Sequence, residues 1–210
     1  MVANKKHRVI GIDFDNTLID YNQIMLQTAN NMNLISGTQP LSKKDIRNKI
    51  RTLKDGERKW QHFQATIYGS QINHGRLPDG VEEFFKNCNT HGLKTYIVSH
   101  KTKFSKDADN PVNLRSAALD WMKTNGFFNP QGIGLTLKDI FFEPTRREKI
   151  NRITSLKCTD FIDDLQETFL DERFPKSVKK ILYSSNISIN SMSEIDVAQN
   201  WNGVNEIIFD

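Results

Sequence analysis

Hydrophobic positions along the chain fall into short clusters separated by longer segments of helical periodicity. Short runs rich in β-branched residues are typical of strands buried on both faces of a sheet. Five such runs are present, at residues 9–12, 93–100, 139–143, 161–162 and 181–183. Their alternation with helical segments predicts an α/β protein with a Rossmann-like parallel sheet and right-handed crossovers. A strand order of 3-2-1-4-5 would place the first strand between the second and the fourth, at the switch point where ligands bind in open sheets.

Helical spacing dominates the segment after the first strand. Apolar residues recur at helical spacing from Ile24 to Ile35, and Ser42 is a suitable N-cap for a second helix that reaches about Leu53. Further helices are predicted over 57–72, from Pro78 to Gly92, over 113–124, from Thr145 onward and over 197–208. The chain therefore divides into a helical insertion, residues 20–77, and an α/β domain formed by residues 1–19 and 78–210.

Composition sets the class of protein. A chain of 210 residues can bury a full core and suits one domain with an insertion or two modest domains. No apolar run approaches the roughly 18 to 20 residues of a membrane span, and the polar, basic N-terminus does not resemble a signal peptide. Cys88 and Cys158 offer no disulfide framework. We therefore expect reduced cysteines and a cytoplasmic protein without membrane contact.

Positive charge is concentrated in one stretch of the insertion. Ser42–His62 holds eight Lys and Arg residues against three Asp and Glu residues. A solvated helix face with i,i+4 ion pairs is the commoner origin of such a stretch, and binding of an anionic substrate is the second interpretation. Arg51, Arg58 and His62 are plausible contacts for such a substrate. Because no aromatic interleaving or known nucleic-acid motif accompanies the stretch, nucleic acid is an unlikely partner.

Two aspartates, Asp13 and Asp15, follow the first strand. Residues i and i+2 of a strand face the same side, so the two carboxylates can converge on one point. Buried carboxylates need a positive partner, and Mg²⁺ is a suitable one because it binds through one or two carboxylates together with substrate phosphate. A solvated acidic turn at the end of a strand is the alternative interpretation.

The order of apolar strand, Asp13, Phe14, Asp15, Asn16, Thr17 and Leu18 resembles the first signature of the haloacid dehalogenase (HAD) superfamily, most of whose members are Mg²⁺-dependent phosphatases. The helical insertion resembles the cap that many members carry at this point. Ser99, at the end of the second strand, resembles the second signature. Its hydroxyl group and the following N–H could bind phosphoryl oxygens, and His100 next to it is either a substrate contact or a surface histidine.

The two remaining signatures follow in the expected order. Lys149 precedes the fourth strand on a helix, as the third signature does; Lys157 is the alternative, but it lies at the entrance of that strand. Asp163 and Asp164 end the fourth strand and resemble the fourth signature. Since neighbours on a strand face opposite sides, we expect Asp163 to bind the metal directly. Asp164 would bind it through water or would lie next to the direct ligands without contacting the metal.

This resemblance implies a phosphatase that hydrolyses a small phosphate monoester through an aspartyl-phosphate intermediate. The substrate would be a small phosphorylated metabolite. Asp13 would be the nucleophile and Asp15 the general acid and base. Mg²⁺ would be held by Asp13, the backbone carbonyl of Asp15, Asp163 and, less directly, Asp164. Ser99, His100 and Lys149 would bind the phosphoryl group, and Thr17 would brace the loop.

Two alternatives stay open. One is a halide- or phosphonate-cleaving enzyme of the same superfamily, which the acid at Asp15 and the lack of an obvious Schiff-base lysine in the insertion disfavour. The other is a catalytically silent HAD-like module that binds an anionic partner. The polar loop of residues 101–111, with Lys101 and Lys103, is either disordered or functional, such as a lid that contacts substrate. The sequence leaves the substrate and the oligomeric state open.

Overall fold

The computed structural model describes residues 8–107, 109–184 and 194–210. Contacts between residues divide the chain into two compact units. The α/β unit comprises the chain up to Ile19, Leu77–Lys101 and the chain from Gly126 onward, and the helical unit comprises Asp20–Arg76 and Thr102–Asn125. The sequence-based division assigned residues 102–125 to the α/β domain, whereas here they join the helices of the insertion. Within the described ranges, no helix is long and apolar enough to cross a membrane.

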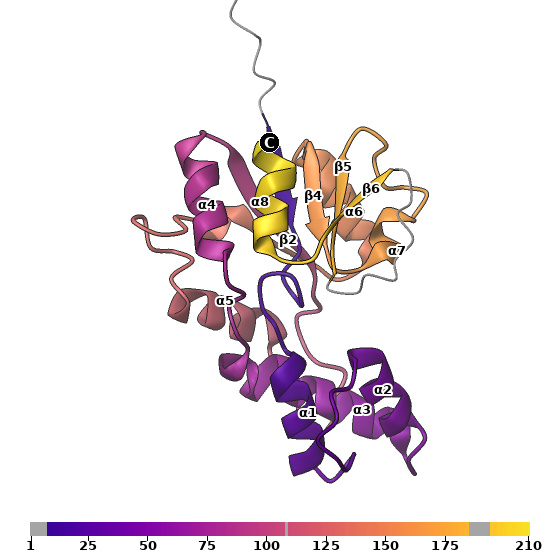
Figure 1. Cartoon of the computed structure of the whole chain (residues 1–210). Coiled ribbons are helices and arrows are strands. Elements are labelled where there is room, and N and C mark those ends of the chain that lie inside the picture. The colour runs from indigo at the N-terminus through magenta and orange to yellow at the C-terminus, as the bar shows by residue number, and fades with distance from the viewer. Residues whose placement is uncertain (1–7, 108, 185–193) are drawn as a thin grey trace, which may run out of the picture. The chain divides into compact units, whose positions relative to one another are not determined.

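The described strands of the α/β unit form one six-stranded sheet in which all neighbours are parallel (Figure 1). Its order is β3-β2-β1-β4-β5-β6. The bounds are β1 Val9–Ile12, β2 Lys94–His100, β3 Ile140–Glu143, β4 Asp160–Asp163, β5 Lys179–Tyr183 and β6 Ile195–Ala198. The predicted α/β class and the order 3-2-1-4-5 are confirmed, and β6 extends the sheet at one edge. β1 therefore lies between β2 and β4, as a site at the switch point requires.

The prediction of a helix over 197–208 was wrong at its beginning. Val197 belongs to β6 and pairs with Leu182 of β5, and the helix α8 begins only at Trp201 and ends at Phe209. Asn200 separates the two elements because its side chain accepts a hydrogen bond of 3.0 Å from the backbone N–H of Gly203 and so caps the helix.

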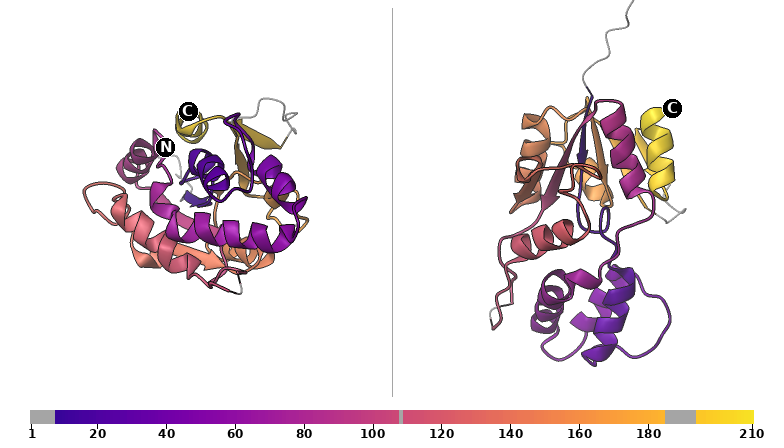
Figure 2. Two further views of the ribbon diagram at one scale, coloured as in Figure 1. Left: turned by 90° about the horizontal axis from the view of Figure 1, so that it is seen from below. Right: turned by 90° about the vertical axis from the view of Figure 1, so that its left-hand side faces the viewer.

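Helices cover both faces of the sheet (Figure 2, right). On one face, α4 (Val81–Thr90) packs against α8, and the ring centroids of Phe84 and Trp201 lie 5.0 Å apart. On the other face, α6 (Arg146–Ser155) packs against β2 and β3, and its buried Ile150 and Ile153 join Phe161 of β4 in the core. Two short helical elements complete the unit, η3 (Leu137–Asp139) and α7 (Gln166–Phe169).

Gly11 of β1 lies against the ring of Phe161. A Cβ atom at position 11 would come within 2.5 Å of Phe161 Cδ2, closer than non-bonded carbon atoms approach. Phe161 is fully buried and cannot turn toward solvent. The absence of a side chain at residue 11 is therefore what lets a large aromatic ring pack beneath the central strand.

The helical unit is built from both of its chain segments. Its elements are α1 Asn22–Asn31, α2 Lys43–Arg51, α3 Gly56–Ala65, the π-helical turn η1 Thr66–Ser70, the 3₁₀ turn η2 Ile72–His74 and α5 Leu114–Thr124. The predicted helix over 57–72 is thus divided among α3, the π-helical turn η1, which is wider than an α-helix, and the 3₁₀ turn η2, which is narrower. α5 packs on η1 and η2, and Trp121 Nε1 donates a 3.0 Å hydrogen bond to the carbonyl oxygen of Gly75. These contacts place residues 102–125 in this unit.

Polar contacts close the helical unit. Asp20 and Arg76 exchange two backbone hydrogen bonds, of 2.8 and 3.0 Å, which join the two ends of the first segment. The polar loop before α5 is ordered where it is described: the backbone N–H of Ser105 donates to the carbonyl oxygen of Val112 at 2.9 Å. The same loop is tied to α3 by a side-chain contact between His62 and Asp107 and by an ion pair between Arg58 and Asp109, each at 2.7 Å. Part of the basic stretch thus contacts carboxylates of the unit itself.

Candidate active site

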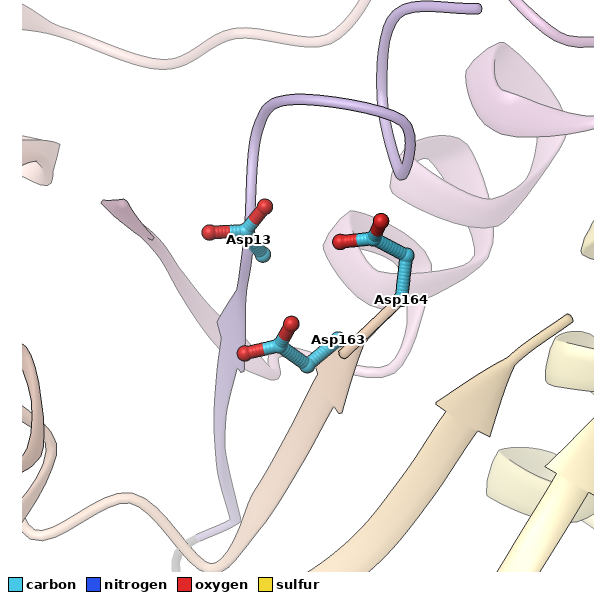
Figure 3. A group of neighbouring side chains, drawn as sticks. All are labelled: Asp13, Asp163 and Asp164. Carbon is cyan, nitrogen blue, oxygen red and sulfur yellow. The ribbon is translucent and has the colours of Figure 1, made fainter. Parts of the chain in front are cut away.

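Three carboxylates converge at the carboxyl ends of β1 and β4 (Figure 3). The backbone N–H of Asp13 donates a 2.9 Å hydrogen bond to the carbonyl oxygen of Ile162, which continues the pairing of β1 with β4 beyond the strand. Asp163 is the last residue of β4, and Asp164 follows it. One oxygen atom of each side chain lies within 4.8 Å of the others. Asp13 is 4% exposed and Asp163 is fully buried.

Asp164 reaches this group although it is a sequence neighbour of Asp163. The expectation that only one of the two faces the site assumed a continuing strand. Because β4 ends at Asp163, the alternation of side chains does not apply to the next residue. Both carboxylates are thus available, and the assignment of the direct ligand to Asp163 stays a prediction.

Lys149 of α6 is buried among these carboxylates. Its Nζ atom lies 2.5 Å from Asp13 Oδ1 and 2.7 Å from Asp163 Oδ2, and it also lies 5.3 Å from the centre of the Phe161 ring. The alternative, Lys157, is an exposed residue in the turn between α6 and β4, with a φ angle of 54°. The structure therefore brings Lys149, and not Lys157, to the predicted site.

The electrostatics of this group follow from its burial. Burial raises the pKa of Asp13 to about 7, and the charge of Asp163 adds to the rise while Lys149 opposes it. Burial also disfavours the charged form of Lys149, but the two carboxylates outweigh this and raise its pKa. One ammonium group thus has to compensate the negative charges of the carboxylates that surround it.

The donor set fits a hard divalent cation. Asp13, Asp163 and Asp164 supply carboxylate oxygens, the ligands that Mg²⁺ prefers, and a cation would offset the cost of burying them together. Asp163 is oriented by the backbone N–H of Leu165, which donates to its Oδ1 atom at 2.9 Å. The carboxylate of Asp15 does not belong to this group of three; its predicted contact with the metal is through the backbone carbonyl and stays a prediction.

Ser99 and His100 end β2, the strand on the other side of β1. Ser99 is buried, with 1% of its surface exposed. The His100 ring nitrogen Nε2 lies 3.0 Å from the carbonyl oxygen of Pro144. Partial burial of the imidazole lowers the pKa of His100, so the ring is neutral at pH 7 and a weaker ligand for phosphate than an imidazolium would be. Both phosphate-binding assignments stay predictions.

Neither protein-family models nor curated proteins match this sequence, but solved structures match it along almost its whole length. A HAD hydrolase of family IA, variant 3, from Entamoeba histolytica is 11% identical, with 93% of this chain and 94% of that chain covered and a TM-score of 0.62. YfnB from Bacillus subtilis, solved bound to magnesium, is 14% identical over 98% and 100% of the two chains, with a TM-score of 0.58. The chain has the haloacid dehalogenase fold.

The HAD fold is found in proteins of different description. Protein Tyrosine Kinase A from Mycobacterium tuberculosis covers 99% of this chain with 100% of its own and reaches a TM-score of 0.64 at 12% identity. Similarity at this level establishes the predicted HAD-like fold and nothing finer, because one fold supports many chemistries. The reaction has to be argued from the residues of this chain.

Asp15 has a partner that the sequence analysis missed. Lys101 Nζ lies 2.7 Å from Asp15 Oδ2 and 3.0 Å from Asp15 Oδ1. We placed Lys101 in a polar loop as a possible substrate contact, but it is buried directly beyond β2. The available signal was its position two residues after Ser99, at the end of a strand next to the Asp13 strand.

The loop after β1 is braced by a tryptophan. Trp201 Nε1 donates a 3.2 Å hydrogen bond to the carbonyl oxygen of Thr17, and the backbone N–H of Leu18 donates to the carbonyl oxygen of Phe14 at 2.9 Å. Asn16 between them has a φ angle of 60°, a conformation that asparagine tolerates better than most residues. Thr17 contributes its backbone carbonyl oxygen to this contact, so a role of its side chain in bracing the loop stays a prediction.

Proposed function

We propose that this protein is a Mg²⁺-dependent phosphatase that hydrolyses a small phosphate monoester. The observation that carries the proposal is the buried carboxylate of Asp13, which Lys149 contacts beside Asp163 and Asp164 at the carboxyl end of the central strand. A buried carboxylate in such a group can serve as a nucleophile if positive charge compensates the approach of a phosphate dianion. Asp15, two residues later, supplies the acid and base that the reaction requires.

The first half of the reaction transfers the phosphoryl group to Asp13. An oxygen atom of its carboxylate attacks phosphorus in line, the bond from phosphorus to the leaving oxygen breaks, and Asp15 donates its proton to that oxygen. In the second half, Asp15 removes a proton from water, the water oxygen attacks the aspartyl-phosphate, and inorganic phosphate leaves. Asp13 is then regenerated as a carboxylate and Asp15 carries a proton again.

The charge of the phosphoryl group is met by groups from three elements. The Lys149 ammonium group and the Ser99 hydroxyl group would bind its equatorial oxygens. Asp13, Asp163 and Asp164 would hold the Mg²⁺ ion, with the backbone carbonyl of Asp15 as a further ligand. When bound, this ion supplies the positive charge that allows carboxylates and phosphate to approach one another. The magnesium bound to YfnB, a protein of the same fold, supports this assignment.

Hydrolysis of an aryl phosphate, measured with and without Mg²⁺, tests the proposal. We expect release of phosphate that requires Mg²⁺ and is lost in Asp13→Asn, a variant that keeps the size of the side chain. Asp45→Asn is the matched control because Asp45 is an exposed residue of α2. Turnover by Asp13→Asn within about tenfold of wild type, a barrier change of only about 1.4 kcal/mol, would exclude Asp13 as the nucleophile. Absence of turnover by wild type over a panel of phosphate esters would favour the silent binding module.

A further inference from the structure

Two lysines are buried among the residues that the structure describes, and the proposed function uses only one of them. Lys149 is 3% exposed and Lys101 is 4% exposed. Burial of an ammonium group is costly unless it is paired, and a long flexible lysine side chain loses rotamer entropy when it is fixed. A second buried lysine in the same unit therefore calls for a physical explanation.

The backbone of Lys101 is fixed by the sheet. Its N–H donates a 2.8 Å hydrogen bond to the carbonyl oxygen of Glu143, the last residue of β3. The parallel pairing of β2 with β3 thus continues one residue beyond the end of β2. Lys101 therefore starts from a rigid element, although it precedes a long polar loop.

The side chain of Lys101 is directed to Asp15. Its Nζ atom contacts both carboxylate oxygens, at 2.7 and 3.0 Å, and lies 5.5 Å from the centre of the Phe14 ring. The side chain of Asp15 is 20% exposed and that of Lys101 is 3% exposed. The contact thus joins a loop carboxylate, which has access to solvent, to a cation that has almost none.

Asp13 and Asp15, the first two aspartates after β1, each contact a different lysine. Lys149 reaches Asp13 from α6, and Lys101 reaches Asp15 from the end of β2. Asp13 is also held by its backbone pairing with β4. Asp15 lies two residues further along, beyond the pairing of β1 with β4, and its carboxylate contacts Lys101 through both oxygen atoms.

We propose that Lys101 is a positioning residue for Asp15, an inference that rests on the proposed phosphatase function. Lys101 holds the Asp15 carboxyl group in one orientation, so that a proton passes from Asp15 to the leaving oxygen while the bond from phosphorus to that oxygen breaks. The same orientation serves the second half-reaction, in which Asp15 takes a proton from water. Lys101 itself exchanges no atoms with substrate.

A series of substituted phenyl phosphates tests this role. The leaving phenol ranges from acidic, with a nitro group, to weakly acidic, with a methoxy group, while its size stays nearly constant. Acidic phenols leave without a proton, and weakly acidic ones depend on the general acid. A plot of log kcat/KM against the pKa of the leaving phenol therefore measures how well Asp15 donates its proton.

In Lys101→Met, we expect a steeper plot than in wild type. kcat/KM for the nitrophenyl ester should change by less than about threefold, and kcat/KM for the least acidic phenol should fall about 10- to 100-fold, a part of the effect of a whole general acid. Asp15→Asn should show the same steep plot. Lys101→Arg keeps the cation and should restore part of the wild-type slope. Lys106→Met, a change of an exposed lysine in the following loop, is the matched control and should keep the wild-type slope.

The outcomes separate this assignment from the proposed function. A uniform loss across the series with an unchanged slope, in folded Lys101→Met, would overturn the positioning role and leave the phosphatase intact. No hydrolysis by wild type would overturn the phosphatase and the positioning role with it. If Lys101→Met does not fold, Lys101→Gln replaces it, because glutamine is polar but has a shorter side chain without the charge; it is expected to lose the contact with Asp15 and to give the same steeper plot.

Discussion

Lys149 Nζ lies 2.5 Å from Asp13 Oδ1, a contact in which both side chains are at most 6% exposed. The two residues are separated by 136 positions in the sequence. The same ammonium group contacts Asp163, so a single cation joins the carboxyl ends of β1 and β4. Stability and chemistry of this region therefore depend on one side chain.

Replacement of Lys149 by methionine should destabilise the metal-free protein. Breaking a buried ion pair by removing one partner costs about 3–5 kcal/mol, because the remaining charge is left uncompensated. We expect a loss of this size in the free energy of unfolding, measured by urea denaturation with a chelator present. The double variant Lys149→Met/Asp13→Asn should recover part of the lost free energy of unfolding, because one of the uncompensated carboxylates is removed. Equal stability of Lys149→Met and wild type would contradict the contact.

Asp13 should make the stability of the metal-free protein depend on pH. Burial raises the pKa of Asp13 from 3.8 to about 7. Between these values, the folded state keeps a proton that the unfolded state has released, so the free energy of unfolding falls as the pH rises from about 4 to about 7. Asp13→Asn removes this loss and should show a flatter profile of melting temperature against pH, with a higher melting temperature than wild type at about pH 8.

Asp171→Asn provides the control for this profile. Arg173 lowers the pKa of Asp171 to about 2. Its contribution to stability is therefore lost only as the pH falls below about 4, and the variant should follow wild type between pH 5 and 8. A profile of Asp13→Asn that runs parallel to wild type would mean that Asp13 is ionised in the folded protein throughout this range.

Ser99 and His100 should differ in their effect on turnover. Removal of one donor that binds developing charge lowers kcat about 10²- to 10³-fold, and we expect Ser99→Ala to lose that much without a change in melting temperature beyond about 3 °C. His100→Ala should lose much less, because its imidazole is neutral and contacts the carbonyl oxygen of Pro144. A larger loss in His100→Ala than in Ser99→Ala would reverse the assignment of the phosphate contacts.

Two glycine substitutions should have opposite effects on stability. Gly11→Ala forces a Cβ atom against Phe161 and should lower the free energy of unfolding by about 1–3 kcal/mol, as overpacking of a core does. Gly203→Ala in α8 meets no atom closer than 3.7 Å and should raise it by about 0.5–1 kcal/mol through helix propensity. Both are measured by urea denaturation. A neutral Gly11→Ala would show that the ring of Phe161 can move aside.

The order of the central strands and the position of the acidic residues at their carboxyl ends could be predicted from the sequence alone. Asp13 and Asp163 each follow an apolar run, and the rule that carboxyl ends of parallel strands share one edge brings them together. The same reasoning selected Lys149 over Lys157, because only a residue on the helix before the strand can reach that edge.

Features that depend on distant partners could not be predicted in this way. β6 is short and was merged with the helix that follows it, because a four-residue apolar run next to a helical pattern has no period of its own. Residues 102–125 belong to the helical unit through packing such as that of Val112 on Gly69, which leaves no local pattern. The partner of Lys101 was missed because a polar loop shows its composition and not its contacts.

The two backbone hydrogen bonds between Asp20 and Arg76 join the ends of the first segment of the helical unit only. The second segment, which contains α5, follows β2 in the sequence and is therefore synthesised later. The chain passes between the two units four times, at 19/20, 76/77, 101/102 and 125/126. Of the two neighbours of β1, β2 begins at Lys94 and β4 begins at Asp160, which pairs with Ile10. Contacts between residues so far apart in the sequence predict slow folding. During synthesis at the ribosome, β1 can pair with β4 only after about 150 further residues have been added. β1, the strand that precedes Asp13, therefore has an unpaired edge in every nascent chain that lacks β4. Pairing with β4 covers this edge, after which it can no longer pair with another chain and aggregate.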